Sequence, residues 1–141
     1  MPDGGCFCGK VRMRYTDDIA GTALCHCADC RKISGGAYST NIIVPGEGFE
    51  VTSGQPKTIT KKADSGNDIT SYFCGDCGTT LFRGGATFGQ NKVVKVGVMD
   101  DPKIIEAAKP AMELYVPQRA SWLAPVAGSQ QLKDMPGSAS V

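Results

Sequence analysis

The seven cysteines constrain the fold of this 141-residue chain more than any other feature of its sequence. They fall into three tight groups, which contribute four outer cysteines (Cys6, Cys8, Cys74 and Cys77) and one cysteine triplet (Cys25, Cys27 and Cys30). At these spacings a tight turn brings the sulfurs into the coordination sphere of one soft cation such as zinc. Seven is an odd number, so the cysteines cannot all form disulfides within one chain. The pattern therefore predicts metal-binding thiolates.

The cysteines divide unevenly if zinc is the metal. A closed structural zinc site takes four protein ligands, which leaves three cysteines over. We favour a partition in which the outer cysteines hold one zinc and the cysteine triplet holds a second, giving two zinc ions per chain. A rival partition joins Cys27 and Cys30 with Cys74 and Cys77, as in a zinc ribbon, and the spacing alone leaves it open.

The cysteine triplet, whose members are also the candidate catalytic residues, offers zinc one ligand fewer than a closed site does. Its fourth position is either open to a substrate or closed by a residue from elsewhere, and the spacing permits both. His26 lies between two of the cysteines, but neighbouring side chains in an extended segment point to opposite faces. We therefore expect His26 to face away from the metal. Asp29 is a candidate fourth ligand, with a solvated turn carboxylate as the alternative.

The charge of the triplet indicates what chemistry it suits. Three thiolates on a divalent cation leave a net charge of roughly −1, so the metal is a weak Lewis acid and poorly suited to making hydroxide. Such a metal still lowers the pKa of an incoming thiol. Arg31 and Lys32 follow directly and are candidate binding residues, either offsetting the negative charge or binding a substrate carboxylate. The alternative for both is ordinary surface charge.

Composition and pattern predict a mainly β protein built from antiparallel hairpins, with at most short helices. Eighteen glycines and eight prolines indicate many turns. Short helices are expected at 28–33 and 102–108. Alternating or β-rich stretches predict strands at 11–15, 20–24, 38–44, 49–52, 58–62, 69–73, 79–82, 92–98 and 111–116. We expect one domain over residues 1–127, with Trp122 and Leu123 as an apolar anchor, and a loosely ordered tail over residues 128–141.

Charge and hydropathy argue against two classes of partner. The net charge is +1 with dispersed Lys and Arg, which leaves no basic surface for nucleic acid. No apolar run approaches the roughly 20 residues needed to span a bilayer, so no membrane association is expected. Residues 1–5 lack the basic and apolar regions of a signal peptide. We expect a cytoplasmic protein, in which closely spaced cysteines bind metal more often than they form disulfides. The oligomeric state is not readable from the sequence.

Three cysteine-containing stretches together resemble a known family. They are residues 5–9 (GCFCG), 25–35 (CHCADCRKISG) and 73–79 (FCGDCGT). This compound motif is similar to that of the glutathione-dependent formaldehyde-activating enzymes, also called the S-(hydroxymethyl)glutathione synthase or centromere-protein-V-like family. The resemblance runs from about residue 5 to residue 122, and residues 113–115 and 119–123 resemble the ending of fungal members.

The resemblance implies a fold, two metal sites and a reaction. The fold would be the Mss4-like arrangement of hairpins around zinc. The outer cysteines would hold a structural zinc and the cysteine triplet a catalytic zinc, with glutathione as co-substrate. The reaction would be the condensation of glutathione with formaldehyde to S-hydroxymethylglutathione, classed as a carbon–sulfur lyase in the reverse direction. Substrates across the family are diverse, so another small carbonyl or electrophile is an alternative partner.

Two other functions compete with this one. A non-catalytic zinc module could bind a protein through its β surface, and a triplet zinc closed by a protein side chain would favour it. A redox module could use Cys27 and Cys30 as a C-x-x-C pair, although the third cysteine and the paired cysteines elsewhere fit a metal better.

Overall fold

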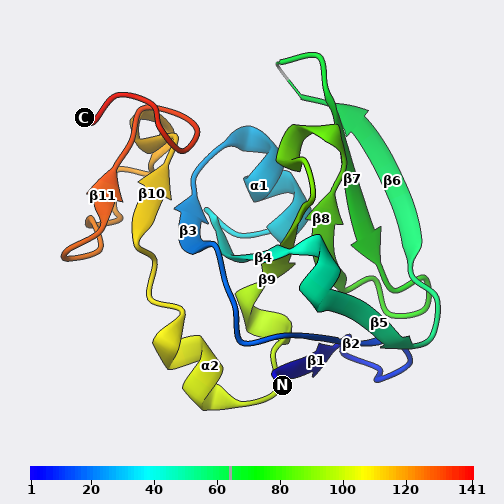
Figure 1. Ribbon diagram of the computed structural model, residues 1–141. Helices are drawn as coiled ribbons and strands as arrows, with labels where there is room; N and C mark the ends of the chain where they lie inside the picture. The colour runs from blue at the N-terminus through cyan, green and yellow to red at the C-terminus, as the bar shows by residue number, and fades with distance from the viewer. Residues whose placement is uncertain (64) are drawn as a thin grey trace.

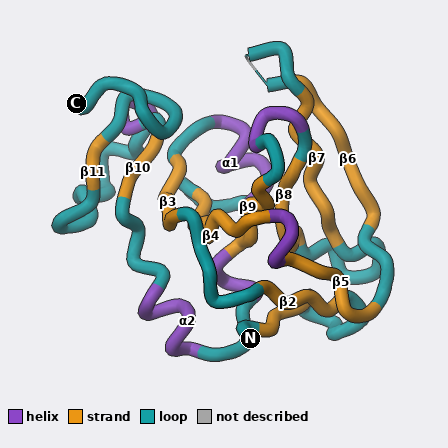
Figure 2. Tube along the Cα trace, viewed as in Figure 1, coloured by secondary structure: helices purple, strands orange, loops and turns teal. Residues whose placement is uncertain are grey.

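The computed structural model describes residues 1–63 and 65–141 and confirms a mainly β chain with only two short α-helices in that part (Figures 1 and 2). The strands are β1 (Asp3–Gly5), β2 (Arg12–Tyr15), β3 (Gly21–Cys25), β4 (Ser39–Pro45), β5 (Phe49–Ser53), β6 (Lys57–Lys62), β7 (Asp68–Phe73), β8 (Thr80–Gly84), β9 (Asn91–Lys95), β10 (Met112–Leu114) and β11 (Gln130–Gln131). The helices are α1 (Ala28–Ser34) and α2 (Pro102–Ala107), with 3-10 turns η1 (Gly46–Gly48), η2 (Ala86–Phe88), η3 (Val96–Val98) and η4 (Val116–Gln118). No helix in the described ranges is long and apolar enough to cross a membrane.

The strands form two sheets. A small sheet has the order β1-β2-β5, and a large one has the order β11-β10-β3-β4-β9-β8-β7-β6. Pairing is antiparallel from β3 to β6, as expected of hairpins, but β10 lies parallel to both β3 and β11. Figure 1 shows the C-terminal strands at one side of the molecule and β6 and β7 at the other, with α1 between them.

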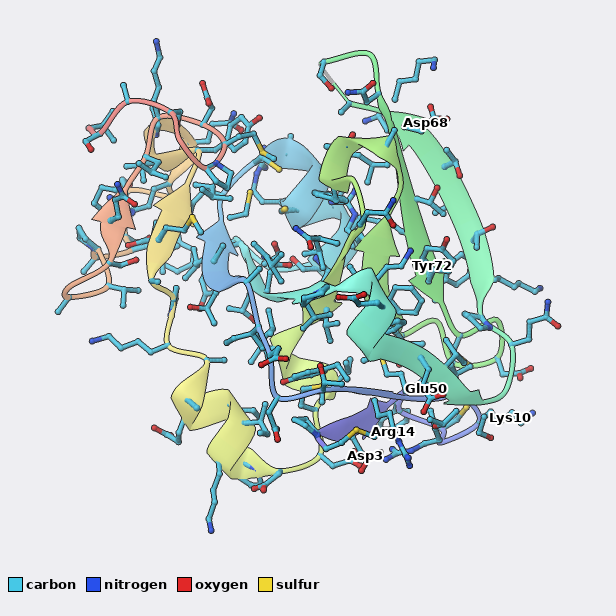
Figure 3. The ribbon with its side chains drawn as sticks, in the orientation of Figure 1. Asp3, Lys10, Arg14, Glu50, Asp68 and Tyr72 are labelled. Carbon is cyan, nitrogen blue, oxygen red and sulfur yellow. The ribbon has the colours of Figure 1, made fainter. Side chains whose placement is uncertain are left out.

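The small sheet packs tightly against the rest of the chain near the N-terminus. Asp3 of β1 and Arg14 of β2, both labelled in Figure 3, form an exposed ion pair of 3.2 Å. Gly4 bridges to Met99, and a Cβ at Gly4 would lie only 2.5 Å from the Val98 carbonyl oxygen. Glycine is therefore required where β1 approaches η3.

The central strands of the large sheet bury two different faces. One face is apolar: Ile42 and Val44 of β4, Val94 of β9 and Phe82 of β8 belong to the main core. Phe82 stacks on Tyr72, which is labelled in Figure 3, at a ring distance of 4.3 Å, and this pair adds to the stability of the core. The opposite face carries the buried polar side chains Ser39, Asn41, Ser71, Arg83 and Lys95. The polar face positions the candidate site.

The segment expected to be a loose tail is partly packed against the sheet. Gln130–Gln131 forms β11 beside β10, and Leu132 is only 1% exposed in a second core cluster with Ala23, Cys25, Cys30 and Leu114. A single apolar residue and backbone pairing anchor this segment, and neither produces a periodic pattern in sequence. The expected anchor was also wrong in part, because Trp122 is 75% exposed. The domain boundary at residue 127 stays a prediction.

Candidate metal centres and the adjoining cavity

The four outer cysteines converge as the favoured partition predicted. Their sulfurs all lie within 4.8 Å of one another, with 3.6 Å between Cys6 and Cys8 and 3.7 Å between Cys8 and Cys74. Four sulfurs placed tetrahedrally about 2.3 Å from a zinc ion would be separated by about 3.8 Å. The residues therefore fit zinc, and the zinc-ribbon partition, which would bring Cys27 and Cys30 to this site, is wrong. All seven cysteines are free of disulfides.

Two similar turns deliver the outer cysteines. The N–H of Gly9 donates to the Cys6 carbonyl, and the N–H of Gly78 donates to the Cys74 carbonyl. Both glycines have φ close to 80°, in the left-handed region that glycine adopts without strain. Local sequence therefore shapes each turn.

Hydrogen bonds join the two turns and favour the thiolate form of one ligand. The N–H of Phe7 donates to Thr79 Oγ1 at 3.0 Å, and that hydroxyl lies 3.2 Å from Cys77 Sγ. Hydrogen bonding by the Thr79 hydroxyl and N–H lowers the pKa of Cys77 to about 5. Thiolates are the form in which cysteine binds a metal.

The cysteine triplet forms where β3 ends and α1 begins. Cys25 is the last residue of β3, Cys27 caps α1 by accepting the Cys30 N–H at 3.3 Å, and all three sulfurs lie within 4.8 Å of one another. Hydrogen bonds from Cys25 and Cys27 lower the pKa of Cys30, and the same close contacts raise that of Cys25. The thiolate form is thus favoured at Cys30 and disfavoured at Cys25, and a bound cation would favour the thiolate form of all three.

Neither candidate fourth ligand joins the triplet. His26 faces away as predicted, and its Nε2 lies 2.8 Å from Glu113 Oε1. Asp29 instead accepts from Lys61 Nζ at 2.9 Å. Within residues 1–63 and 65–141, no His, Asp, Glu or further Cys ligand atom lies in the triplet cluster. The described side chains therefore leave the triplet one ligand short of a closed site.

Glu113 joins the triplet loop to the C-terminal segment. This carboxylate is 1% exposed and has four hydrogen-bond or ion-pair partners: His26 Nε2, the Val126 N–H at 2.8 Å, Gln131 Nε2 at 2.7 Å and Arg119 Nη2 at 3.2 Å. Burial raises the pKa of Glu113, but its partners outweigh burial and lower that pKa to about 2. In the sequence Glu113 stood out only as part of a family-like ending, because its partners lie far from it on both sides in the chain.

A cavity of about 560 Å³ adjoins the triplet but not the outer cysteines. Alternate residues of the large sheet form its floor, among them Ala23, Asn41, Val93 and Lys95. Its lining also includes Lys61 of β6 and, from the C-terminal part, Tyr115, Gln118, Met135 and Pro136. Tyr115 adopts a left-handed conformation with φ of 55°, which is uncommon for a residue with a bulky side chain. Residues distant in sequence therefore enclose the space beside the triplet.

The basic residues of the cavity differ from those expected. Arg31 and Lys32 are exposed in the last turn of α1 and do not line the cavity, because Cys30 occupies the inward side of this helix. Arg83 and Lys95 line it instead, at 6% and 9% exposure. The only signal in the sequence for Lys95 was its place in the β-rich stretch 92–98, and a lysine within a strand is more often exposed.

Lys95 is connected to the triplet through a chain of polar side chains. Its Nζ donates to Asn41 Oδ1 at 2.7 Å, and Asn41 Nδ2 donates to Ser39 Oγ at 3.0 Å. The Ser39 hydroxyl in turn hydrogen bonds Cys30 and helps to lower its pKa. Burial lowers the pKa of Lys95 to about 8, while the Cys30 thiolate acts in the opposite direction. This cation therefore lies where it can offset negative charge on the triplet.

Fold and site together define a class: small mainly β proteins with two thiol clusters able to hold metal ions, one of them beside a cavity. Comparison with known families then makes the assignment specific. Residues 1–118 match the family model for the glutathione-dependent formaldehyde-activating enzymes, and the chain belongs to this family.

Two individual proteins show how far the similarity extends. A Penicillium rubens protein, named provisionally as a glutathione-dependent formaldehyde-activating enzyme, is 33% identical over 79 residues. The match covers 55% of this chain but only 40% of the relative. A crystal structure of a Rhodobacter sphaeroides protein aligns with a TM-score of 0.55 at 18% identity, covering 72% of this chain and 92% of that one. This second likeness concerns the fold alone.

Proposed function

We propose that this protein binds a thiol, glutathione in the first place, at the cysteine triplet and forms or cleaves its adduct with formaldehyde or another small carbonyl. In the forward direction the C–S bond forms, the carbonyl π bond breaks, and the carbonyl oxygen takes a proton to become a hydroxyl. The reverse reaction makes the protein a carbon–sulfur lyase. One observation carries the proposal: the triplet, and not the four-cysteine cluster, lines the cavity.

The chain's own residues supply binding and charge. The thiolates of Cys25, Cys27 and Cys30 would hold a zinc ion, and zinc when bound would keep an incoming thiol in its thiolate form at neutral pH. Lys95 offsets the accumulated negative charge through Asn41 and Ser39. Family membership supports glutathione and formaldehyde as the reactants.

Titration of the cobalt-substituted protein with glutathione tests the proposal. We expect the sulfur-to-cobalt charge-transfer absorption to grow until one thiol is bound per chain. Cys27→Ser should bind one metal equivalent instead of two and lose the thiol response while keeping its β-sheet circular dichroism. Lack of any spectral change at millimolar glutathione would overturn the proposal and favour a non-catalytic, protein-binding zinc module.

A further inference from the structure

His26 is the only histidine of the chain, and it stands between two cysteines of the triplet, Cys25 and Cys27. The residue is 1% exposed. Its backbone N–H donates to the Leu114 carbonyl oxygen at 3.1 Å, and its ring Nε2 lies 2.8 Å from Glu113 Oε1. Backbone and side chain therefore both attach His26 to β10. Holding this residue also holds the backbone from which the two neighbouring sulfurs project.

Glu113 holds the histidine ring in one defined orientation. Its Oε1 faces His26 Nε2 and Arg119 Nη2, and its Oε2 accepts from the Val126 N–H and from Gln131 Nε2. A carboxylate only accepts hydrogen bonds, so the proton of this pair lies on His26 Nε2. A neutral amide offers one oxygen and cannot accept on both sides. The four donors around Glu113 therefore require the carboxylate.

The other ring nitrogen of His26 has no such support. Its Nδ1 is buried and has no hydrogen-bond partner among the described residues. It also does not belong to the cluster of triplet sulfurs. A buried polar atom without a partner is costly, and an apolar side chain in this place would avoid that cost. Contact with Glu113 is thus the feature that accounts for a histidine here.

We propose that Glu113, acting through His26, is a positioning residue for a metal ion at the cysteine triplet. It would keep the backbone of Cys25 and Cys27 in the geometry that lets three sulfurs bind one ion. Partners that orient ligands from outside the coordination sphere typically change metal affinity ten- to a hundredfold when they are replaced. The inference rests on the metal-binding part of the proposed function, since it requires an ion at the triplet.

Competition of the cobalt-loaded chain with a chelator tests the proposal, because the two bound ions can be followed by their absorption. Cys27→Ser, expected to keep only the ion of the outer cysteines, supplies the reference spectrum for that site. We expect Glu113→Gln to lower the affinity of the triplet roughly ten- to a hundredfold. The affinity of the outer cysteines should stay unchanged, so each molecule carries its own control.

Replacement of the histidine separates positioning from general stability. His26→Gln can still donate from an amide nitrogen towards Glu113 and should keep most of the triplet affinity, whereas His26→Leu should lose as much as Glu113→Gln. The double variant of His26→Leu and Glu113→Gln should bind no more weakly than either single variant, because both remove the same contact. Val44→Ala, which weakens the main core instead, should leave the triplet affinity unchanged.

Nuclear magnetic resonance of the native chain gives a second measurement, because a single histidine produces one set of ring signals. In the metal-loaded chain the nitrogen shifts should show a proton on Nε2 and no metal on Nδ1. Should Glu113→Gln fail to fold, the two His26 variants and these signals still decide.

The outcomes separate this inference from the proposed function. Native triplet affinity in both Glu113→Gln and His26→Leu would overturn the positioning role and leave the proposed function intact. Equal loss at both metal sites would also overturn it, because that result marks a general loss of stability. Uptake of a single ion by the native chain, or an ion bound to His26 Nδ1, would overturn both.

Discussion

Two buried charged residues flank the cysteine triplet, and their charges are satisfied in different ways. Glu113 is surrounded by donors from four different parts of the chain. Among the described residues Lys95 has one hydrogen bond, to Asn41, and it depends on the negative charge of the triplet. Removing either partner of such a pair leaves a buried charge uncompensated, which is strongly destabilising.

At the residue scale we predict that Glu113 makes stability depend on pH below 4.5. Its pKa is lowered from 4.5 to about 2, so its contribution is present above the unfolded pKa and is lost as pH falls through the folded one. The shift corresponds to about 3 kcal/mol. Denaturant unfolding at several pH values should show Glu113→Gln less stable than the native chain at pH 6, with the gap closing towards pH 2.

A pH-independent gap would contradict this prediction. Metal release in acid affects both chains, so metal content is measured in parallel and the comparison is made between the chains at each pH. Gln keeps the shape of Glu113 and can still accept hydrogen bonds, which makes loss of the charge the main change.

At the element scale, β10 and β11 turn the C-terminal segment into part of the site. β10 runs parallel to β3, with Met112 opposite Ala23 and Leu114 opposite Cys25, so it lies against the strand that ends in the triplet. β11 adds to the outer edge of β10, and Met135 and Pro136 beyond it reach the cavity. The family match ends at residue 118, so β11, Met135 and Pro136 lie outside the matched region, whereas β10 lies within it.

We predict that Leu132 holds this segment in place. It is 1% exposed and packs with Cys25 and Cys30, so Leu132→Ala should cost about 2–5 kcal/mol through lost burial and the cavity left behind. Thermal unfolding provides the measurement. Trp122→Ala is the control: Trp122 is 75% exposed, and its replacement should change stability by no more than about 0.5 kcal/mol. Equal effects of the two substitutions would contradict the packing described.

At the scale of the whole molecule, the outer cysteines tie the beginning of the chain to its middle. Cys8 and Cys74 are separated by 66 positions in sequence but by 3.7 Å between sulfurs. A structural zinc held by these four cysteines would add its binding free energy to folding, which is roughly 10–16 kcal/mol in zinc-finger peptides. Loss of the four-cysteine site should therefore destabilise the fold more than loss of the triplet site.

We predict that removing the metal with a chelator unfolds the small sheet and destabilises the whole chain. Cys74→Ser should reproduce this effect, because Cys74 is buried at the joint between the turns. Cys27→Ser, at the half-buried edge of the triplet, should leave the melting temperature within a few degrees of the native value. Metal analysis and circular dichroism would measure the metal content and the fold of both variants. Equal destabilisation by the two substitutions would argue against a division into structural and functional sites.

Sequence alone determined the features that depend on local spacing. The grouping of the cysteines, the turns after Cys6 and Cys74, the short helices and most strands follow from which residues stand one to four positions apart. The orientation of His26 also followed from the alternation of side chains in an extended segment. These features need only a few neighbouring residues to specify them.

Tertiary structure alone decided which distant residues meet. Arg83, Lys95 and Glu113 looked like ordinary charged residues. Only the pairing of β8, β9 and β10 within the large sheet buries them, Arg83 and Lys95 in the cavity wall and Glu113 among partners from the C-terminal segment. Leu132 stood in a polar stretch, and the parallel pairing of β10 placed it in a core. The physical reason is that burial of a charge or a lone apolar residue depends on the order of the strands in the sheet. The hydrophobic periodicity of a single segment does not specify that order.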